Sequence, residues 1–268
     1  MSQHAVTDFS FVSYRSNLIT VEWQSLIESL QSPDAAERSQ AILAIGHQRE
    51  TRAINHLVTI LCTDPDLNVQ EDTTWSLVRM GSDAVDALLA ALNDADPQVR
   101  HNIIHTLGKI ADVRALAALI QATTDTDQKV RYKAIYALGQ IGHVDAIDAL
   151  IAALSDELQT VSWMAREVLE GFGDRAVESL IAALKTSPSD VQELIVSLLG
   201  DTGDERALLP LIDVLSASED WEVRFAAIQA LGQFGDERAL AALLSLTEDN
   251  NPRISAIASA MVKQLGGS

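Results

Sequence analysis

The chain has few of the residues that stabilise small secreted folds or membrane proteins. Its 268 residues include one cysteine, Cys62, so no disulfide can form within the chain. No apolar run reaches the roughly 18 residues that suggest a membrane span. The first residues, MSQHAVTDFS, also lack the cationic start and apolar core of a secretory signal. We therefore expect a soluble, cytoplasmic protein with no membrane span, in which Cys62 is a buried or half-buried, inert thiol.

Basic residues are scarce as well. Nineteen lysines and arginines oppose 38 acidic residues, which gives a net charge of −19 at pH 7. Phosphate backbones and anionic membranes repel such a surface unless basic side chains gather locally. No run of lysine and arginine is present. The composition therefore argues against nucleic acid as a partner and favours a basic or mixed-charge protein.

Proline and glycine are also infrequent, and most of them recur at regular intervals. Residues 130–143 read VRYKAIYALGQIGH, and their apolar positions, among them Val130 and Leu138, form one stripe with helical spacing. Asp127 stands three residues before Val130, where its side chain can cap a first helical turn. This stretch predicts a helix that begins after Asp127 and ends near Gly142.

The same pattern returns along the chain. Intervals of 30 to 32 residues separate the apolar positions that correspond to Leu138, which are Ile45, Leu77, Leu107, Leu138, Leu169, Leu199, Leu231 and Val262. The position eight residues earlier, that of Val130, is valine in six of the eight copies. Another helical pattern, such as AVDALLAALND, lies between successive copies. Periods of this length indicate stacked helix pairs. The sequence thus predicts one all-α solenoid over residues 19–268, preceded by an arm over residues 1–18.

Polar residues repeat with the same period. Three places before the valine position stand helix-capping residues, which are Asp34, Asp66, Asp96, Asp127, Asp220 and Asn251. Leu158 and Pro188 interrupt this column. Just after the valine position stand Arg38, Arg100, Arg131 and Arg224. The recurrence predicts ladders of aspartate–arginine hydrogen bonds between stacked repeats. The glycines of ALGQIG and LLGDTGD are expected to end helices.

The repeat resembles the short HEAT-like repeats of the phycobilisome-lyase HEAT-like group. The tetratricopeptide pattern and the Thr-Pro-Leu-His of ankyrin repeats are missing, and the run EDTTWSLVRMG is similar to cyanobacterial members of the group. The resemblance extends over about nine-tenths of the chain, residues 21–265. It implies a right-handed α-solenoid of about eight short helix pairs, whose second helices line a concave groove.

In such a groove, the residues two, three and six places after the valine position would face a partner. Aromatic, charged, polar and methionine side chains hold these places in repeats two to five: Glu71, Asp72, Trp75, His101, Asn102, His105, Tyr132, Lys133, Tyr136, Trp163, Met164 and Glu167. Rigid aromatic side chains dominate binding hot spots. We therefore predict that these twelve residues bind a protein partner. The competing interpretation is that the aromatic rings only fill gaps between adjacent helices.

Chemical motifs are absent or incomplete. His101 and His105 have the spacing of two metal ligands on one helix face, but HNIIH carries asparagine where His-Glu-x-x-His sites carry glutamate. No Gly-rich phosphate loop or nucleophile elbow is present. The sequence therefore predicts no catalytic residue, no metal site and no cofactor.

The resemblance also implies two functions. Relatives of this repeat group bind an iron–sulfur carrier protein or recognise phycobiliproteins, which makes a non-catalytic scaffold for such a partner the first hypothesis. The alternative is a phycobilin lyase, lyase subunit or bilin chaperone. It would attach phycocyanobilin or another linear tetrapyrrole to a phycobiliprotein cysteine, with the groove aromatics stacked on the pigment and Glu71, Asp72 or Glu167 as the acid. Against it, the chain lacks the Tyr-Tyr-Ala-Ala-Trp-Trp-Leu and Asn-His-Cys-Gln-Gly-Asn runs of lyase subunits.

Overall fold

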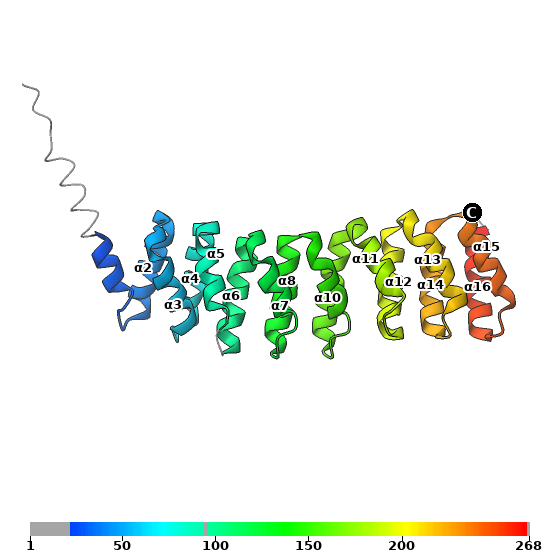
Figure 1. Cartoon of the computed structure of the whole chain (residues 1–268), viewed down its shortest axis with the longest axis horizontal. Coiled ribbons are helices and arrows are strands. Elements are labelled where there is room, and N and C mark those ends of the chain that lie inside the picture. Colours follow the sequence, from blue (N-terminus) through cyan, green and yellow to red (C-terminus); the bar gives the residue numbers. More distant parts are fainter. Residues whose placement is uncertain (1–21, 94–95, 267–268) are drawn as a thin grey trace, which may run out of the picture. The chain divides into compact units, whose positions relative to one another are not determined.

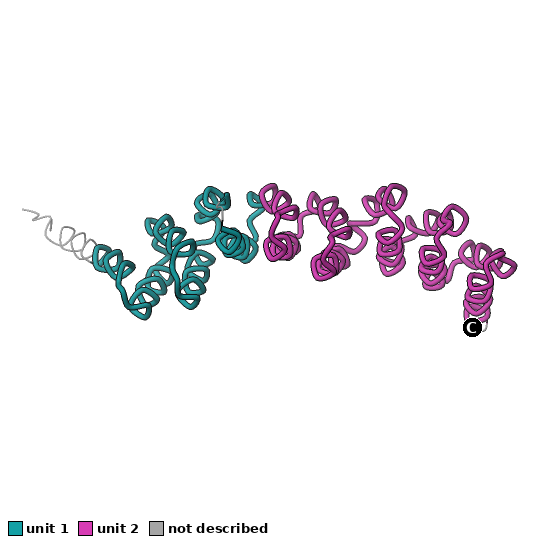
Figure 2. Tube along the Cα trace, turned by 90° about the horizontal axis from the view of Figure 1, so that it is seen from below, with its two compact units in different colours: residues 1–115 teal, residues 116–268 magenta. Residues whose placement is uncertain are grey.

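The computed structural model describes residues 22–93 and 96–266. These residues form helices and short connections and contain no strand, which confirms the all-α solenoid expected from the sequence (Figure 1). The arm expected over residues 1–18 lies outside the described residues. The chain divides into two compact units, unit 1 over residues 1–115 and unit 2 over residues 116–268 (Figure 2). Each unit is described by itself.

The longer helix of each pair carries the apolar stripe first seen in residues 130–143. Among the described residues, eight helices of this kind occur: α2 (Ala35–Gln48), α4 (Leu67–Met80), α6 (Pro97–Ile110), α8 (Gln128–Ile141), α10 (Gln159–Phe172), α12 (Ser189–Thr202), α14 (Trp221–Phe234) and α16 (Pro252–Gly266). We call them second helices. Val130 and Leu138 have no exposed surface, so the stripe forms the core, as its spacing predicts.

The helix that precedes each second helix is shorter, and we call it a first helix. Residues 22–29 belong to such a helix, and the others follow in chain order: α3 (Ile54–Thr63), α5 (Val85–Ala91), α7 (Leu116–Ala122), α9 (Ile147–Ala153), α11 (Val177–Leu184), α13 (Glu205–Ala217) and α15 (Glu237–Ser245). Most begin with a 3₁₀ turn whose last residue is a fully buried alanine, as at Ala53, Ala84, Ala115, Ala146 and Ala176. The small side chain leaves room for the neighbouring backbone.

Capping residues set where the second helices begin. The Asp127 carboxylate accepts hydrogen bonds from the backbone amides of Lys129, at 2.8 Å, and Val130, at 3.3 Å. Five other predicted capping residues accept an amide in the same way: Asp34, Asp66, Asp96, Asp220 and Asn251. Leu158 and Pro188 form no side-chain cap. The polar column and its two interruptions are therefore confirmed.

The helices of each unit lie in two layers, one of first helices and one of second helices (Figure 2). In unit 2, α8 packs against α10, α12 against α14 and α14 against α16, while α9 packs against α11 and α11 against α13. In unit 1, α2 packs against α4 and α4 against α6. The inner second helices α4, α10, α12 and α14 therefore each have one side on their first helix, two sides on neighbouring second helices and one side toward solvent.

The hydrogen-bond ladder between repeats exists, but its acceptor is not the capping aspartate. Arg131 donates from Nε and Nη2 to Asp156, at 2.6 and 2.9 Å, and Asp156 stands two residues before the capping position of the next repeat. Arg38 pairs with Asp64 at 2.7 Å and Arg224 with Asp249 in the same register. The prediction that named the capping column was wrong. The capping carboxylates accept amides of their own first turn, whereas Asp156 accepts both the Leu158 amide and the Arg131 guanidinium.

A second series of ion pairs joins the starts of the first helices. Arg114 contacts Asp112 and Asp86, Arg206 contacts Asp204 and Glu178, and Arg238 contacts Asp236 and Glu205. Hydrogen bonds from the Arg206 side chain lower the pKa of Asp204 to about 2. Hydrogen bonds from Arg131 likewise hold the pKa of Asp156 below its ordinary value. These carboxylates are thus stabilised in their charged form.

The glycines expected to end helices divide into two kinds. Gly142 ends α8 with a φ of 64°, a conformation that glycine adopts without strain. Gly139 and Gly200 instead lie inside α8 and α12. A Cβ atom on Gly200 would stand 2.6 Å from the Cβ of Ala230 on α14. The prediction is therefore wrong for this first glycine of each motif, which permits close approach of the next second helix.

Candidate protein-binding faces

The twelve residues predicted to bind a partner fall into two groups, six in each unit. In unit 1, helix α4 carries Glu71, Asp72 and Trp75, and helix α6 carries His101, Asn102 and His105. We call these six residues the α4–α6 face. In unit 2, α8 carries Tyr132, Lys133 and Tyr136, and α10 carries Trp163, Met164 and Glu167. We call these six the α8–α10 face.

The α4–α6 face is hollowed. A cavity of about 530 Å³ lies between the two helices, and five of the six predicted residues line it, namely Glu71, Asp72, Trp75, Asn102 and His105. His101 is half-buried on α6 and does not belong to this lining. The spacing of these residues along the two helices predicted that they lie together, and five of the six do so in the structure.

Trp75 is exposed over 37% of its surface, yet two neighbours fix its ring. The imidazole of His47, on α2, meets it edge-on with ring centroids 5.0 Å apart. The guanidinium of Arg79 lies 4.9 Å from the centroid and also donates to the backbone oxygen of Gly46 at 3.2 Å. Cation–π contacts of this kind hold a ring in place. Trp75 therefore presents a rigid aromatic surface, with little side-chain entropy left to lose on binding.

A chain of amides forms the floor of this hollow. Gln98 donates to the Asn102 side-chain oxygen at 2.9 Å, and Asn102 donates to the Gln70 side-chain oxygen at 2.8 Å. Gln70 in turn donates to the backbone oxygen of Asp64 at 2.7 Å. The bonds fix the orientation of each amide, so the floor offers hydrogen-bonding groups in set positions.

The α8–α10 face carries three exposed rings. Tyr132 is exposed over 36% of its surface, Tyr136 over 40% and Trp163 over 60%. Lys133 places its ammonium 5.4 Å from the Tyr136 ring centroid. Met164 is half-buried beside Trp163, and Glu167 is exposed. Rings that only filled gaps between adjacent helices would be buried. The exposure of these three rings therefore argues against that competing interpretation.

Several residues beside the two faces were not predicted. Leu67, Gln98 and Lys109 also line the hollow of the α4–α6 face, and Leu67 is exposed over 73% of its surface. In unit 2, Arg166 on α10, next to Glu167 in the chain, donates to the hydroxyl of Ser197 on α12 at 3.3 Å. One sequence signal could have revealed Leu67, because a leucine stands at the first position of its helix, a solvent-facing site in most other copies.

The described residues whose side chains could bind a metal ion are dispersed. No group of three or more histidine, cysteine, aspartate or glutamate side chains among them is placed to hold a metal ion. Cys62 is half-buried on α3. Within the same part of the chain, no helix is both long enough and apolar enough to cross a bilayer. What these faces can do chemically is to bury aromatic area and pair polar groups with a partner.

Solved structures are similar to this chain at low sequence identity. The archaeal HEAT-like repeats protein from Thermococcus onnurineus NA1 is 16% identical over 80% of this chain and 97% of its own, with a TM-score of 0.50. The complex of CpcE and CpcF of phycocyanin lyase from Nostoc sp. PCC7120 is 19% identical over 90% and 93%, with a TM-score of 0.42. Human deoxyhypusine hydroxylase in complex with glycerol is 18% identical over 84% and 100%, with a TM-score of 0.38.

Sequence comparison assigns the repeats themselves. No curated protein matches the chain at a significant level. The family model of HEAT repeats matches residues 24–90, 85–170, 116–191 and 177–262, which together take in nearly all of the described helices. The chain belongs to the HEAT repeat family.

Proposed function

We propose that this protein is a non-catalytic, cytoplasmic scaffold that binds a protein partner through the α4–α6 face, the α8–α10 face or both. The observation that carries the proposal is the exposure of three aromatic rings, Tyr132, Tyr136 and Trp163, on the solvent side of two adjacent helices. Exposed aromatic side chains on a rigid scaffold are typical of protein-binding hot spots. HEAT repeats commonly mediate protein interactions, which supports the same conclusion.

Charge narrows the class of partner. The chain carries a net charge of −19, and Glu71, Asp72 and Glu167 belong to the two faces. A partner with a basic or mixed-charge surface is therefore favoured over an acidic one. The resemblance of the repeat adds two candidate classes to this inference, a phycobiliprotein and an iron–sulfur carrier protein.

Substitution of the rings tests the proposal. Immobilised full-length protein should retain one stoichiometric partner from a lysate of the source organism. The double variant Tyr132→Ala plus Trp163→Ala should weaken that binding at least about thirtyfold, because the loss of even one hot-spot ring costs about 2 kcal/mol or more and about 1.4 kcal/mol is tenfold. Trp75→Ala tests the α4–α6 face separately.

A matched control comes from the layer of first helices. Leu209, on α13, and Leu244, on α15, are exposed over 58% and 49% of their surfaces. The double variant Leu209→Ala plus Leu244→Ala removes a comparable exposed apolar area outside both faces and should bind the partner normally. Unchanged binding by the ring variants of both faces, with native circular dichroism, would place the partner elsewhere and refute the proposal.

The bilin lyase remains a second candidate, because the exposed rings that suit a protein partner also suit a planar pigment. Trp163, the most exposed of the four face aromatics at 60%, could stack on a tetrapyrrole. If so, phycocyanobilin added to the purified protein should give an induced circular-dichroism band, weakened by Trp163→Ala. A spectrum without an induced band would exclude pigment binding, and the non-catalytic protein scaffold would then be the favoured function.

A further inference from the structure

At three of the junctions where one repeat packs against the next, an arginine just after the valine position bonds to the following repeat. Arg38, Arg131 and Arg224 each pair with an aspartate 25 or 26 residues later in the chain. Each also donates to a backbone oxygen at the end of the preceding first helix or in the turn after it. Their side chains are only 11 to 15% exposed. The slot between repeats is therefore built to take a guanidinium on an aliphatic stem.

The junction between the repeats of α12 and α14 lacks both partners of this pair. Gln192 stands at the arginine position, and Ser218, 26 residues later, stands at the aspartate position. The Gln192 amide donates to the backbone oxygen of Leu184 in its own repeat at 2.9 Å. Ser218 Oγ accepts from the Asp220 amide in the next repeat at 3.2 Å. Neither of these bonds crosses the junction, so no ladder arginine occupies the slot here.

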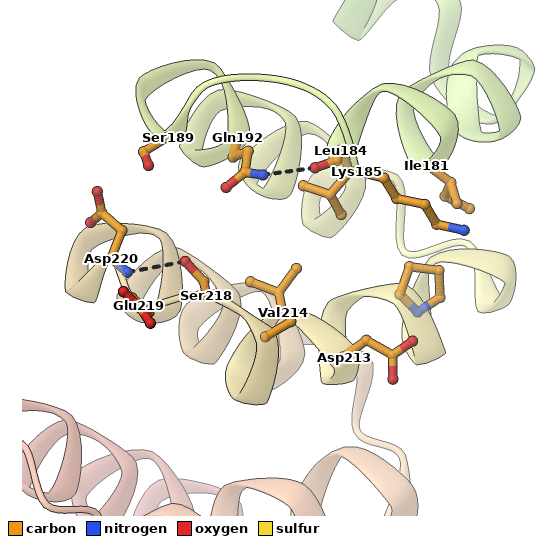
Figure 3. A pocket seen from close by; sticks show the side chains of 12 residues that line it. Ile181, Leu184, Lys185, Ser189, Gln192, Asp213, Val214, Ser218, Glu219 and Asp220 are labelled. Atoms are coloured by element: carbon orange, nitrogen blue, oxygen red, sulfur yellow. Dashed lines mark hydrogen bonds between the residues drawn. The ribbon is translucent and has the colours of Figure 1, made fainter.

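A cleft of about 530 Å³ lies at this junction, between α11 and α13 (Figure 3). Leu184 and Val214 extend into it from opposite walls. At one end, Gln192 and its neighbour Ser189 lie across from the turn that holds Ser218, Glu219 and Asp220. At the other end are Lys185 and Asp213. The cleft thus combines an apolar middle with polar ends.

We propose that this cleft binds an arginine side chain of a partner protein. Three carboxylates, those of Asp213, Glu219 and Asp220, oppose the single ammonium of Lys185 in its lining. The imbalance favours a cationic guest. Leu184 and Val214 can contact the aliphatic part of the arginine side chain. Long cationic side chains commonly lie along apolar surface in this way, with the charged group in a polar environment. The guest guanidinium would take the place that Arg131 occupies in its own junction. The site lies outside both aromatic faces and extends the proposed function.

A pair of peptides tests the proposal on the full-length chain. The probe is acetyl-Leu-Arg-Leu-amide, and its match is the same peptide with citrulline, which keeps the shape of arginine but carries no charge. Binding is followed through the methyl NMR signals of Leu184 and Val214. The arginine peptide should shift these signals saturably, with a millimolar dissociation constant, and the citrulline peptide should bind at least about tenfold more weakly. Equal binding of the two peptides, or no shift with either, would overturn the proposal.

Restoring the ladder supplies an independent test. The double variant Gln192→Arg plus Ser218→Asp recreates the intramolecular pair found at the junctions of Arg38, Arg131 and Arg224, and it should abolish binding of the arginine peptide. The variant Asp213→Asn plus Glu219→Gln should weaken it several-fold, whereas the exposed Glu237→Gln outside the cleft should leave it unchanged. Persistent binding after the slot is filled would contradict the assignment. The variant Tyr132→Ala plus Trp163→Ala should leave peptide binding unchanged. The proposal for this cleft and the proposal for the aromatic faces can therefore be refuted independently.

Discussion

At the scale of single residues, small side chains determine how closely neighbouring second helices approach. The backbone of α12 at Gly200 lies so near α14 that an added Cβ would stand 2.6 Å from Ala230 Cβ. Gly171, in the last turn of α10, has no atom within 4 Å of the same added Cβ. Packing therefore requires a glycine at position 200 of α12, whereas at position 171 of α10 it leaves room for a side chain.

We expect Gly200→Ala to destabilise the protein by about 1–3 kcal/mol, because the added methyl overpacks the contact with Ala230. Gly171→Ala should instead stabilise it by about 0.5–1 kcal/mol, because alanine has the higher helix propensity and the added methyl meets nothing. Urea unfolding followed by circular dichroism measures both. A stabilising effect of Gly200→Ala would show that the two helices can separate without cost.

A second residue-scale prediction concerns the end of α6. Ala111 adopts a φ of 56°, the left-handed conformation that Gly142 adopts at the end of α8. For a residue with a Cβ this conformation costs roughly 1–2 kcal/mol. Ala111→Gly should therefore raise the free energy of unfolding by about 0.5–1 kcal/mol, once the larger entropy of unfolded glycine is deducted. Gly142→Ala should have the opposite effect. A loss of stability in Ala111→Gly would exclude strain at this position.

At the scale of helices, local signals made most of the fold predictable. Asp127 caps α8 and Gly142 ends it through contacts within a few residues, so the sequence alone located both boundaries. The partner of Arg131 could not be found in this way. Asp156 lies 25 residues away in the next repeat. For the equivalent Arg38, the capping residue Asp66 offers a second acid two residues beyond the partner, Asp64. Only the packed structure decides between them, because both carboxylates accept a backbone amide and only Asp64 lies against the Arg38 guanidinium.

The Arg131–Asp156 pair should be the stronger type of ion pair, because both side chains are largely buried. They are 11% and 9% exposed, whereas Arg52 in the pair with Glu50 is 53% exposed. Arg131→Met leaves a buried carboxylate without its guanidinium and should cost about 3 kcal/mol. Arg52→Met is the control and should cost much less, since exposed pairs contribute little. Equal losses in urea unfolding would show that burial does not strengthen the ladder.

The pairs at the starts of the first helices predict a dependence of stability on pH. The folded pKa of Asp204 is about 2, whereas an unfolded aspartate has a pKa of about 3.9. Its contribution to the free energy of unfolding is therefore fully present above about pH 4 and is lost as the pH falls toward 2. Arg206→Met should lower stability by a constant amount from pH 5 to 7, and the difference should shrink below about pH 4 and vanish below about pH 2. If the stability difference between the wild type and Arg206→Met did not change with pH, ionisation of Asp204 would not be the cause of the pH dependence.

At the scale of the whole molecule, the candidate sites follow from differences between copies of one repeat. Trp75, Tyr136 and Trp163 were predictable because helical register alone places them on the solvent side of their helices. The cleft at Gln192 was not, because its existence and size depend on how α11 and α13 pack. The amide floor beside Asn102 depends on side-chain conformations and was likewise beyond sequence reasoning.

The main helix contacts join elements of the same repeat or of adjoining repeats, so stability should be distributed along the chain as in other repeat proteins. Unit 2 should then fold by itself. We expect a fragment of residues 116–268 to keep the helical circular dichroism per residue of the full chain and to unfold cooperatively. A fragment of residues 131–268 is the control. It lacks α7, which packs against α8, and it should unfold at lower urea concentration with a smaller helical signal. If the longer fragment is also unstructured, the two units depend on each other for folding, and the additive description of this chain is wrong.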